Sequence, residues 1–149
     1  MFSKTCQYAI QGTIYVALHG SNKHPIGLAA TAKAQKIPSH FLGKIMQQLV
    51  RKHILKSIKG PNGGFFLAKP PEKIRLIDIY DVFDGIENLE KCVMGFDTCS
   101  GIRPCPLHNS YMPVKEGIFK LLEEKTIKDF VDDVQAKRSY VSYFGWPAD

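Results

Sequence analysis

The chain has 149 residues, of which 44% are hydrophobic and 11% aromatic, so it can build the core of about one folded domain. Its longest apolar runs, such as residues 14–18, are far shorter than a membrane-spanning helix requires. The amino terminus lacks the apolar segment of a secretion signal, and four cysteines in a non-secreted chain are more typical of metal or redox chemistry than of disulfides. We therefore expect a cytoplasmic protein with no membrane partner.

The formal net charge of +6 hides an uneven distribution of charge along the chain. Residues 1–75 contain twelve lysines and arginines against a single acidic residue, Glu72, whereas residues 76–149 contain eight basic and thirteen acidic residues. Lysines are also ordinary solubilising residues, but a strongly basic half is typical of a surface that meets a polyanion. The asymmetry favours nucleic-acid contact by the first half and a different role for the second.

The first part of the chain predicts two short helices after an initial one. Small and apolar residues recur at helical spacing over Thr5–His19, and an alanine-rich helix is expected over Leu28–Gln35. Ser39 suits the N-cap of a further helix that runs to about Lys52. This helix carries an apolar stripe formed by Phe41, Leu42, Ile45, Met46, Leu49 and Val50. Two helices joined by a tight turn, the second strongly amphipathic, indicate a helix-turn-helix.

A hairpin follows this pair of helices. Residues 54–58 and 65–68 are predicted as short strands, and the glycine-rich residues 59–64 between them form a turn. A hairpin directly after a helix-turn-helix is a wing. The predicted fold class is therefore mainly α (α+β), a winged helix-turn-helix with a two-stranded wing, and residues 1–85 are expected to form the DNA-binding domain.

The second half of the chain predicts helices on either side of an irregular loop. A short helix is expected over Leu76–Phe83, and residues 86–109 are expected to be an irregular, cysteine-rich loop. A longer helix then runs to about Lys125, with Pro113 in its first turn or at a kink. Its apolar side is predicted to hold Ile118, Leu121 and Leu122.

Thr126 suits the N-cap of a last helix, expected over Ile127–Val134. The tail beyond it is aromatic and holds Tyr140, Tyr143, Phe144 and Trp146.

Opposite its apolar stripe, the helix that begins near Ser39 presents a face of hydrogen-bonding side chains. Lys and Arg suit guanine edges or phosphates, and Gln suits adenine. The glycines of the wing turn let backbone amides meet phosphates or a minor groove. A merely solvated helix face is the plainer alternative. The predicted DNA-binding residues are Ser39, His40, Lys44, Gln47, Arg51, Lys56, Lys59, Gly60, Asn62 and Gly63.

The loop of residues 86–109 holds three cysteines and a histidine in the pattern C-x6-C-x5-C-x2-H. Thiolates with an imidazole are the ligands of zinc or of an iron–sulfur cluster. The paired C-x2-C of a zinc ribbon is missing, which favours the cluster. Structural zinc, buried free cysteines and a thiol switch that forms a disulfide remain alternatives. The predicted metal ligands are Cys92, Cys99, Cys105 and His108, whereas Cys6 is expected to be a small core residue.

These parts in this order resemble the BadM/Rrf-two family of winged-helix transcriptional regulators. The matching residues are Tyr8-Ala9, residues 37–42 at the start of the second short helix, the wing residues 59–65 and the cysteine loop. The resemblance implies a homodimer on a palindromic operator of double-stranded DNA, with an iron–sulfur cluster that tunes the affinity. It also implies that residues 110–149 form a dimerisation helix and a C-terminal arm.

The chain departs from the family pattern in three ways. The family's usual cysteine spacing is five and five residues, and here it is six and five. IscR-like members have a histidine ligand placed like His108, which favours a two-iron [2Fe–2S] over a four-iron cluster. NsrR-like members use an acidic residue of the partner subunit where this chain has Gln7, a poor ligand, with Cys6 beside it as a possible bridging ligand. Lys59 stands where arginine is common, which loses bidentate recognition.

We therefore expect a transcriptional regulator, repressor or activator, whose operator affinity is tuned by a cluster that senses redox state, nitric oxide or iron–sulfur status. The alternative is a cluster-free thiol switch or partner-binding regulator of the same fold, with or without structural zinc. Neither a Ser/His/Asp constellation nor a nucleotide fingerprint is present, so we expect no enzyme activity and no small-molecule substrate.

Overall fold

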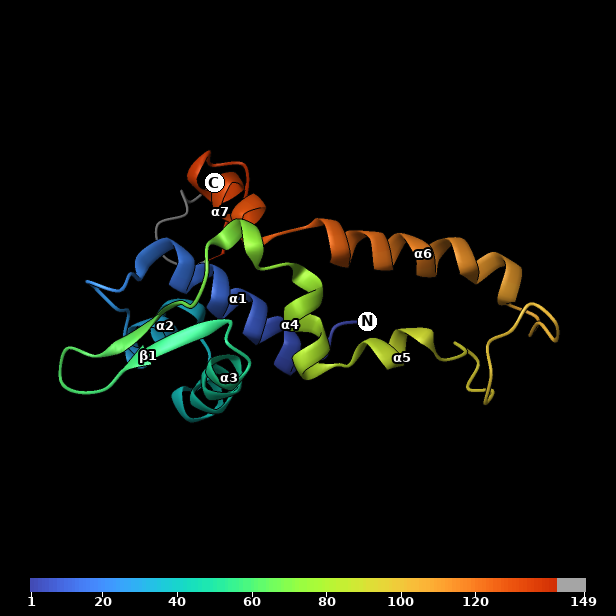
Figure 1. The fold of residues 1–149 in the computed structure, drawn as a ribbon, viewed down its shortest axis with the longest axis horizontal. Helices are drawn as coiled ribbons and strands as arrows, with labels where there is room; N and C mark the ends of the chain where they lie inside the picture. The colour runs from blue at the N-terminus through green and yellow to red at the C-terminus, as the bar shows by residue number, and fades with distance from the viewer. Residues whose placement is uncertain (142–149) are drawn as a thin grey trace.

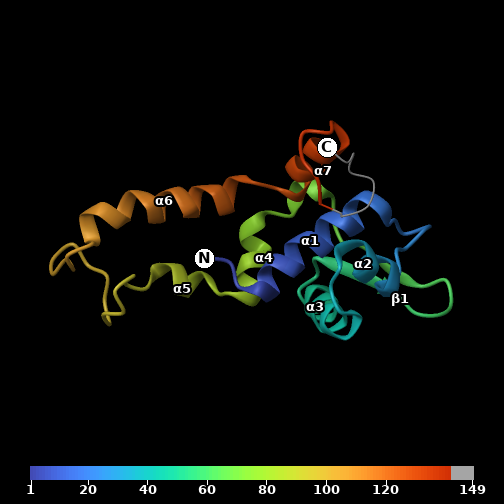
Figure 2. The same cartoon turned by 180° about the vertical axis from the view of Figure 1, so that it is seen from behind.

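The computed structural model describes residues 1–141, and the tail residues Tyr143, Phe144 and Trp146 lie outside that range. The elements in chain order are α1 (Lys4–His19), α2 (Leu28–Gln35), α3 (Ser39–Arg51), β1 (Leu55–Ile58), β2 (Gly64–Leu67), a 3-10 turn (Pro71–Lys73), α4 (Leu76–Phe83), α5 (Ile86–Glu90), α6 (His108–Glu124) and α7 (Ile127–Gln135). Figure 1 shows a body of α1 to α4, the hairpin and α7, from which α5 and α6 extend as an arm. The view from behind in Figure 2 shows the same separation. The predicted fold class is confirmed.

Helix α1 occupies the centre of the body. It begins after Ser3, whose hydroxyl accepts the N–H of Cys6 at 3.1 Å. Small residues on α1 allow α3 to pack closely, because a Cβ placed on Gly12 would already touch Leu42 and Met46 at 3.5 Å. Burial of the large apolar face of α3 against α1 is therefore the main hydrophobic contact of the helix-turn-helix.

The N-cap of helix α3 lies one residue before the predicted one. The carbonyl of Pro38 accepts the N–H groups of Phe41 and Leu42 at 3.1 and 3.0 Å, so Pro38 is the N-cap and Ser39 is the first helical residue. The prediction that Ser39 caps the helix is wrong for this reason. Phe41 also leaves the predicted apolar stripe, since it is 39% exposed and meets the ring of Tyr8 edge-on at 5.9 Å.

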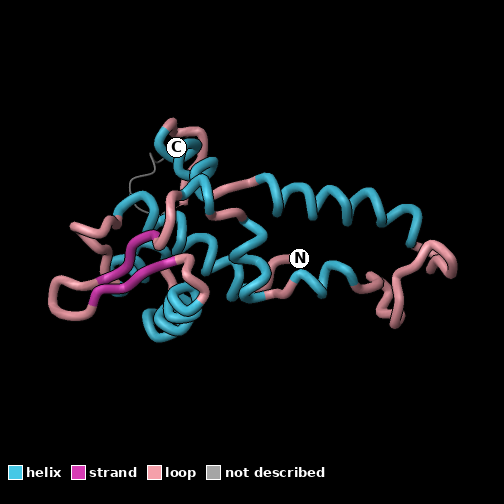
Figure 3. The backbone as a smooth tube through the Cα atoms, in the orientation of Figure 1, coloured by secondary structure: helices cyan, strands magenta, loops and turns pink. Residues whose placement is uncertain are grey.

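The wing is an antiparallel hairpin with Leu55 opposite Leu67 and Ile58 opposite Gly64. Figure 3 shows the two strands in magenta, at the side of the body away from the arm. A bridge ties the hairpin to the helix-turn-helix, because Ile26 and Phe65 exchange both backbone hydrogen bonds, at 3.0 and 2.8 Å. The wing is thus held in a fixed position beside α2 and α3.

The arm leaves the body at the end of α4 and returns beside the start of α4. The N–H of Leu76 donates to the carbonyl of Lys125 at 2.8 Å, and the N–H of Ile127 donates to the carbonyl of Ile74 at 2.9 Å. Within the arm, residues 86–90 form the short helix α5, where an irregular chain was expected. A second core cluster at the root of the arm contains Cys6, Leu76, Ile77, Tyr80, Ile118 and Leu122.

Two predictions about helix α6 differ from the structure. The turn in which the N–H of His108 donates to the carbonyl of Cys105 (2.9 Å) starts the helix early, so Pro113 lies in the second turn and not in the first. Leu121 does not share the buried side of Leu122, because Leu121 is 42% exposed whereas Leu122 is fully buried. Leu121 therefore belongs to an outward face that no other part of the described chain covers.

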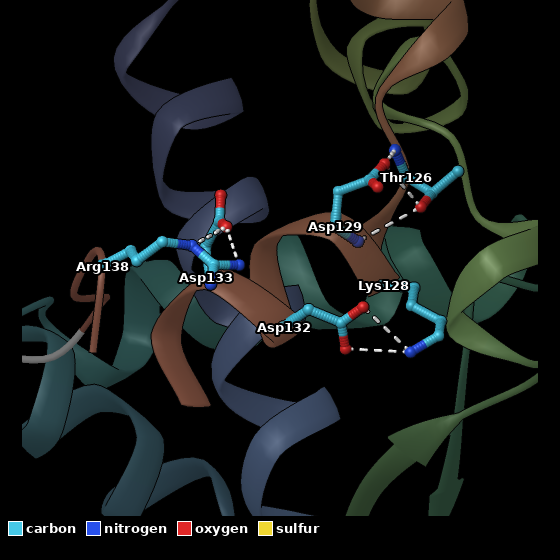
Figure 4. Close-up of polar contacts among 6 residues, drawn as sticks. All are labelled: Thr126, Lys128, Asp129, Asp132, Asp133 and Arg138. Carbon is cyan, nitrogen blue, oxygen red and sulfur yellow. Dashed lines mark hydrogen bonds and ion pairs between the residues drawn. The ribbon is translucent and has the colours of Figure 1, made fainter. Parts of the chain in front are cut away.

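The predicted cap at Thr126 is confirmed. Its hydroxyl accepts the N–H of Asp129, and the Asp129 carboxylate accepts the N–H of Thr126 at 2.7 Å, which is a reciprocal capping box (Figure 4). These hydrogen bonds to Thr126, the backbone one above all, lower the pKa of Asp129. No helix in the described part of the chain is both long and apolar enough to cross a membrane.

Candidate nucleic-acid interface and cysteine site

A groove runs along the exposed side of α3. It is lined by Leu28, Ser39, His40, Gly43, Lys44, Gln47, Gln48 and Arg51. The structure therefore brings together all five residues of α3 that were predicted to read DNA. Sequence reasoning missed Gln48 and Leu28, although Gln48 stands four residues after Lys44 and the helical spacing could have revealed it.

The tip of the wing depends on glycine at two positions. Gly60 has a φ of +111°, which side-chain-bearing residues rarely adopt, and its carbonyl accepts the N–H of Gly63 at 3.0 Å. A Cβ on Gly63 would collide with the carbonyl of Ile58. The predicted contact residues Lys56, Lys59, Gly60 and Asn62 are exposed on this hairpin, and Gly63 is half-buried.

The groove and the wing both belong to the basic half of the chain. In residues 1–75 only Glu72 is acidic, and it lies beyond β2 in the 3-10 turn. The surface formed by α3 and the hairpin therefore carries lysine, arginine and neutral polar groups, which is the charge that a phosphate backbone attracts.

The predicted metal ligands lie at the outer end of the arm, with the three cysteines on the loop between α5 and α6 and His108 as the first residue of α6 (Figure 1). Cys92 is 6% exposed, and Cys99 and Cys105 are half-buried. The Sγ of Cys99 lies 3.5 Å from the Nδ1 of His108. All four cysteines of the chain are thiols, and within residues 1–141 no three potential ligands converge on one point.

Backbone amides surround the sulfur of Cys92. The N–H of Met94 does most to lower the pKa of Cys92; burial opposes it, and the N–H of Phe96, the side chain of Cys105 and the N–H of Gly95 lower it further. The side chain of Cys105 thus affects Cys92, and Cys99 lies beside His108. N–H groups directed at sulfur stabilise a thiolate, which is the form that binds metal.

Cys6 is apart from this loop and fully buried in the core at the root of the arm. Burial, with additions from the charge of Asp84 and a hydrogen bond to it, raises the pKa of Cys6 to about 12. The expectation that Cys6 is a core residue is confirmed. A thiol in this state is a poor ligand and a poor nucleophile.

Comparison with known proteins decides the family. The sequence profile of the Rrf2 family, described as an iron-dependent transcriptional regulator, matches residues 2–133. The chain belongs to the Rrf2 family of transcriptional regulators. A protein of Aquifex aeolicus, described as a candidate HTH-type transcriptional regulator, is 35% identical to this Rrf2 regulator over 134 residues, or 89% of this chain and 92% of that protein. IscR of Erwinia tasmaniensis is 28% identical over 127 residues, which are 85% of this chain and 76% of IscR.

Solved structures agree with this Rrf2 assignment. CymR, the global cysteine regulator of B. subtilis, superposes with a TM-score of 0.75 at 20% identity, over 89% of this chain and 96% of CymR. T. potens IscR superposes with a TM-score of 0.72 at 22% identity, over 94% of this chain and 92% of IscR. At these identities the likeness shows a shared fold alone.

The burial of Cys6 predicts selective chemical labelling of this Rrf2 regulator. In metal-free native protein at pH 8, iodoacetamide should modify Cys99 and Cys105 while sparing Cys6, because the Cys6 thiolate is scarcely populated. Peptide mass spectrometry measures the labelling, and unfolding in urea should make all four cysteines react. Modification of native Cys6 at the same rate as Cys99 would contradict the structure.

Proposed function

We propose that this Rrf2 regulator binds operator DNA through α3 and the wing, and that an iron–sulfur cluster on the arm tunes its affinity. The observation that carries the proposal is the connection between the two sites. The arm holds three thiols and an imidazole at its tip, while its root packs against α1, the helix on which α3 also packs.

The residues of the loop fit an iron–sulfur cluster in their chemistry. Cys92, Cys99, Cys105 and His108 supply three thiolates and an imidazole, and the amides around Cys92 provide the N–H···S contacts that tune such clusters. A [2Fe–2S] cluster is proposed over a [4Fe–4S] cluster because His108 stands where the IscR-like members that the sequence resembles have a histidine ligand. The bound cluster would supply the redox-sensitive or iron-sensitive chemistry of the sensor. The names of the IscR relatives and the family description support an iron-linked role.

The DNA-reading role rests on the groove of α3 and on the wing. One exposed face of α3 carries hydrogen-bonding side chains at the spacing of successive helical turns, which are His40, Lys44, Gln47 and Arg51. A major groove is wide enough to admit an α-helix that presents such a face. The wing tip, with Lys59 and its glycine turn, would contact phosphates or the adjacent minor groove.

The homodimer is supported by the outward face of α6. An exposed apolar residue recurs every seven positions along it, at Leu107 (the N-cap), Val114 and Leu121. Their exposed fractions are 47%, 51% and 42%. Gly117 lies between them with open space in front of it, so a second helix can approach closely. A seven-residue apolar repeat is the pattern by which two helices pair, and a twofold dimer matches a palindromic operator.

The proposed coupling passes through the root of the arm. Tyr80 and Leu122 pack around Cys6 of α1, and a few residues along α1, Gly12 contacts α3. Ordering of the cysteine loop would fix the position of the arm relative to the body. In a dimer this would set the separation of the two α3 helices. Half-site spacing is a geometric requirement for binding both major grooves.

A cluster-free thiol switch is the second candidate function. The side chain of Cys105 lies near enough to Cys92 to affect its pKa, so these two thiols are a candidate pair for a disulfide. Structural zinc on the same four ligands is a further variant of this second candidate. In either case we propose that the protein acts in the cytoplasm and without enzyme activity, as its regulator family suggests.

Iron analysis tests the cluster directly. Protein purified without oxygen should contain close to two irons per chain, show visible absorption bands, and lose both in the Cys99→Ala variant. Cys6→Ala is the matched control and should keep the iron, because Cys6 is buried away from the loop. A colourless wild-type protein with zinc or no metal would favour the thiol switch and leave the DNA-binding role intact.

Two substitutions separate base reading from phosphate contact. Lys59→Ala should weaken binding to all duplexes alike and lower the slope of log K against log salt by about one, as loss of one phosphate contact does. Gln47→Ala should instead relax discrimination at one base pair. Fluorescence anisotropy on a selected operator and its single-base variants measures both, with Lys120→Ala on α6 as the control. A uniform loss of affinity in both variants would contradict the base-reading role of Gln47.

A further inference from the structure

Lys115 is the one buried charged side chain in residues 1–141. It lies on α6, its exposed fraction is 8%, and its Nζ donates a hydrogen bond to the carbonyl of Glu90 at 2.7 Å. Lys120, one turn and a half further along the same helix, has a side chain that is 72% exposed and pairs with Glu124. The helix thus carries one ordinary lysine and one whose burial needs an explanation.

The surroundings of Lys115 leave its charge incompletely balanced. Within the described residues, no carboxylate oxygen lies within 4.0 Å of its Nζ. Removing an ammonium group from water without an anion beside it is costly. The carbonyl of Glu90, at the end of the short helix α5, offsets only part of that cost.

The position of Lys115 indicates where an anion would arise. Glu90 stands two residues before Cys92, so backbone geometry keeps their Cα atoms within about 7 Å of each other. The hydrogen bond therefore fastens the ammonium group to the point where the cysteine loop begins. Cysteines that hold a metal do so as thiolates, and three of them around a cluster give this end of the arm a net negative charge.

We propose that Lys115 is the positioning residue and counter-charge of the cysteine site. This inference rests on the proposed cluster. The hydrogen bond of Lys115 holds the end of α5 against α6, and this sets the distance between the two helices that the cysteine loop has to span. The positive charge of Lys115 stabilises the anionic cluster, and the reduced form more than the oxidised form because reduction adds a negative charge.

Substitutions of Lys115, with one control on the same helix, separate the effect of its charge from that of its hydrogen bond. Lys115→Gln removes the charge but keeps an N–H donor, Lys115→Arg keeps the charge, and Lys120→Gln is the exposed control on the same helix. Lys115→Met removes the charge without burying a new polar group, and it replaces Lys115→Gln if that variant folds poorly. The measurements are the midpoint reduction potential of the bound cluster and the rate of iron release to a chelator, both without oxygen.

The neutral variants should show a lower reduction potential and release iron about tenfold faster or more, the usual scale for an outer-shell partner of a metal site. Lys115→Arg and Lys120→Gln should stay close to the wild type. A neutral variant with wild-type circular dichroism and wild-type potential would overturn the counter-charge, even if iron release were faster. Wild-type protein that holds no iron would contradict the proposed function itself, and this inference with it.

Discussion

The close packing of α1 is the constraint on which the rest of the structure depends. Small residues at the middle of this helix, Ala9 and Gly12 among them, let the large buried face of α3 approach. One to two turns earlier, Cys6 fills the core at the root of the arm. A larger side chain at Cys6 or Gly12 would force one of these layers apart, because protein cores are packed too densely to absorb extra atoms. Helix α3 and the arm thus share a single support.

The body and the arm are built on different principles. The body has a closed core and a basic surface, and the bridge between Ile26 and Phe65 holds its wing in place. The arm is closed at its root, where the backbone of Leu76 meets that of Lys125, and further out by the hydrogen bond between Lys115 and Glu90. Further out it exposes large apolar side chains on the loop and along α6, which are Val93, Met94, Phe96, Ile102, Leu107, Val114 and Leu121. Large apolar side chains left exposed on one element are typical of a contact with another molecule or a bound group, which agrees with the proposed dimer and cluster.

Sequence reasoning predicted the body well because its signals are local. The apolar stripe of α3 and the glycines of the wing turn each determine one element with little help from the rest of the fold. The predicted cap at Ser39 failed by one residue because the carbonyl of Pro38 already accepts the first helical hydrogen bonds. Helix α5 was missed because five residues have no clear periodicity; its start depends on Gly85 at a φ of +77° and on the carboxylate of Asp81, which accepts the N–H of Ile86.

In the arm, tertiary contacts decide what local patterns cannot. The helical spacing of Leu121 and Leu122 does not reveal which of them meets α4, and burial separates them. Lysine is so seldom buried that no pattern would have singled out Lys115. The four candidate ligands of the loop were proposed from residue type and spacing alone, whereas the contact between Cys99 and His108 needed the fold.

The most direct test of the account compares one operator with two forms of the same dimer. Its affinity should be measured at fixed salt for protein loaded with the cluster and for the same protein after the metal is removed. The account predicts affinities that differ by about fivefold or more, the usual scale of coupling between two sites. In the Cys99→Ala variant the two preparations should bind alike. Equal affinity of the loaded and metal-free wild-type dimers would contradict a sensing role for the arm.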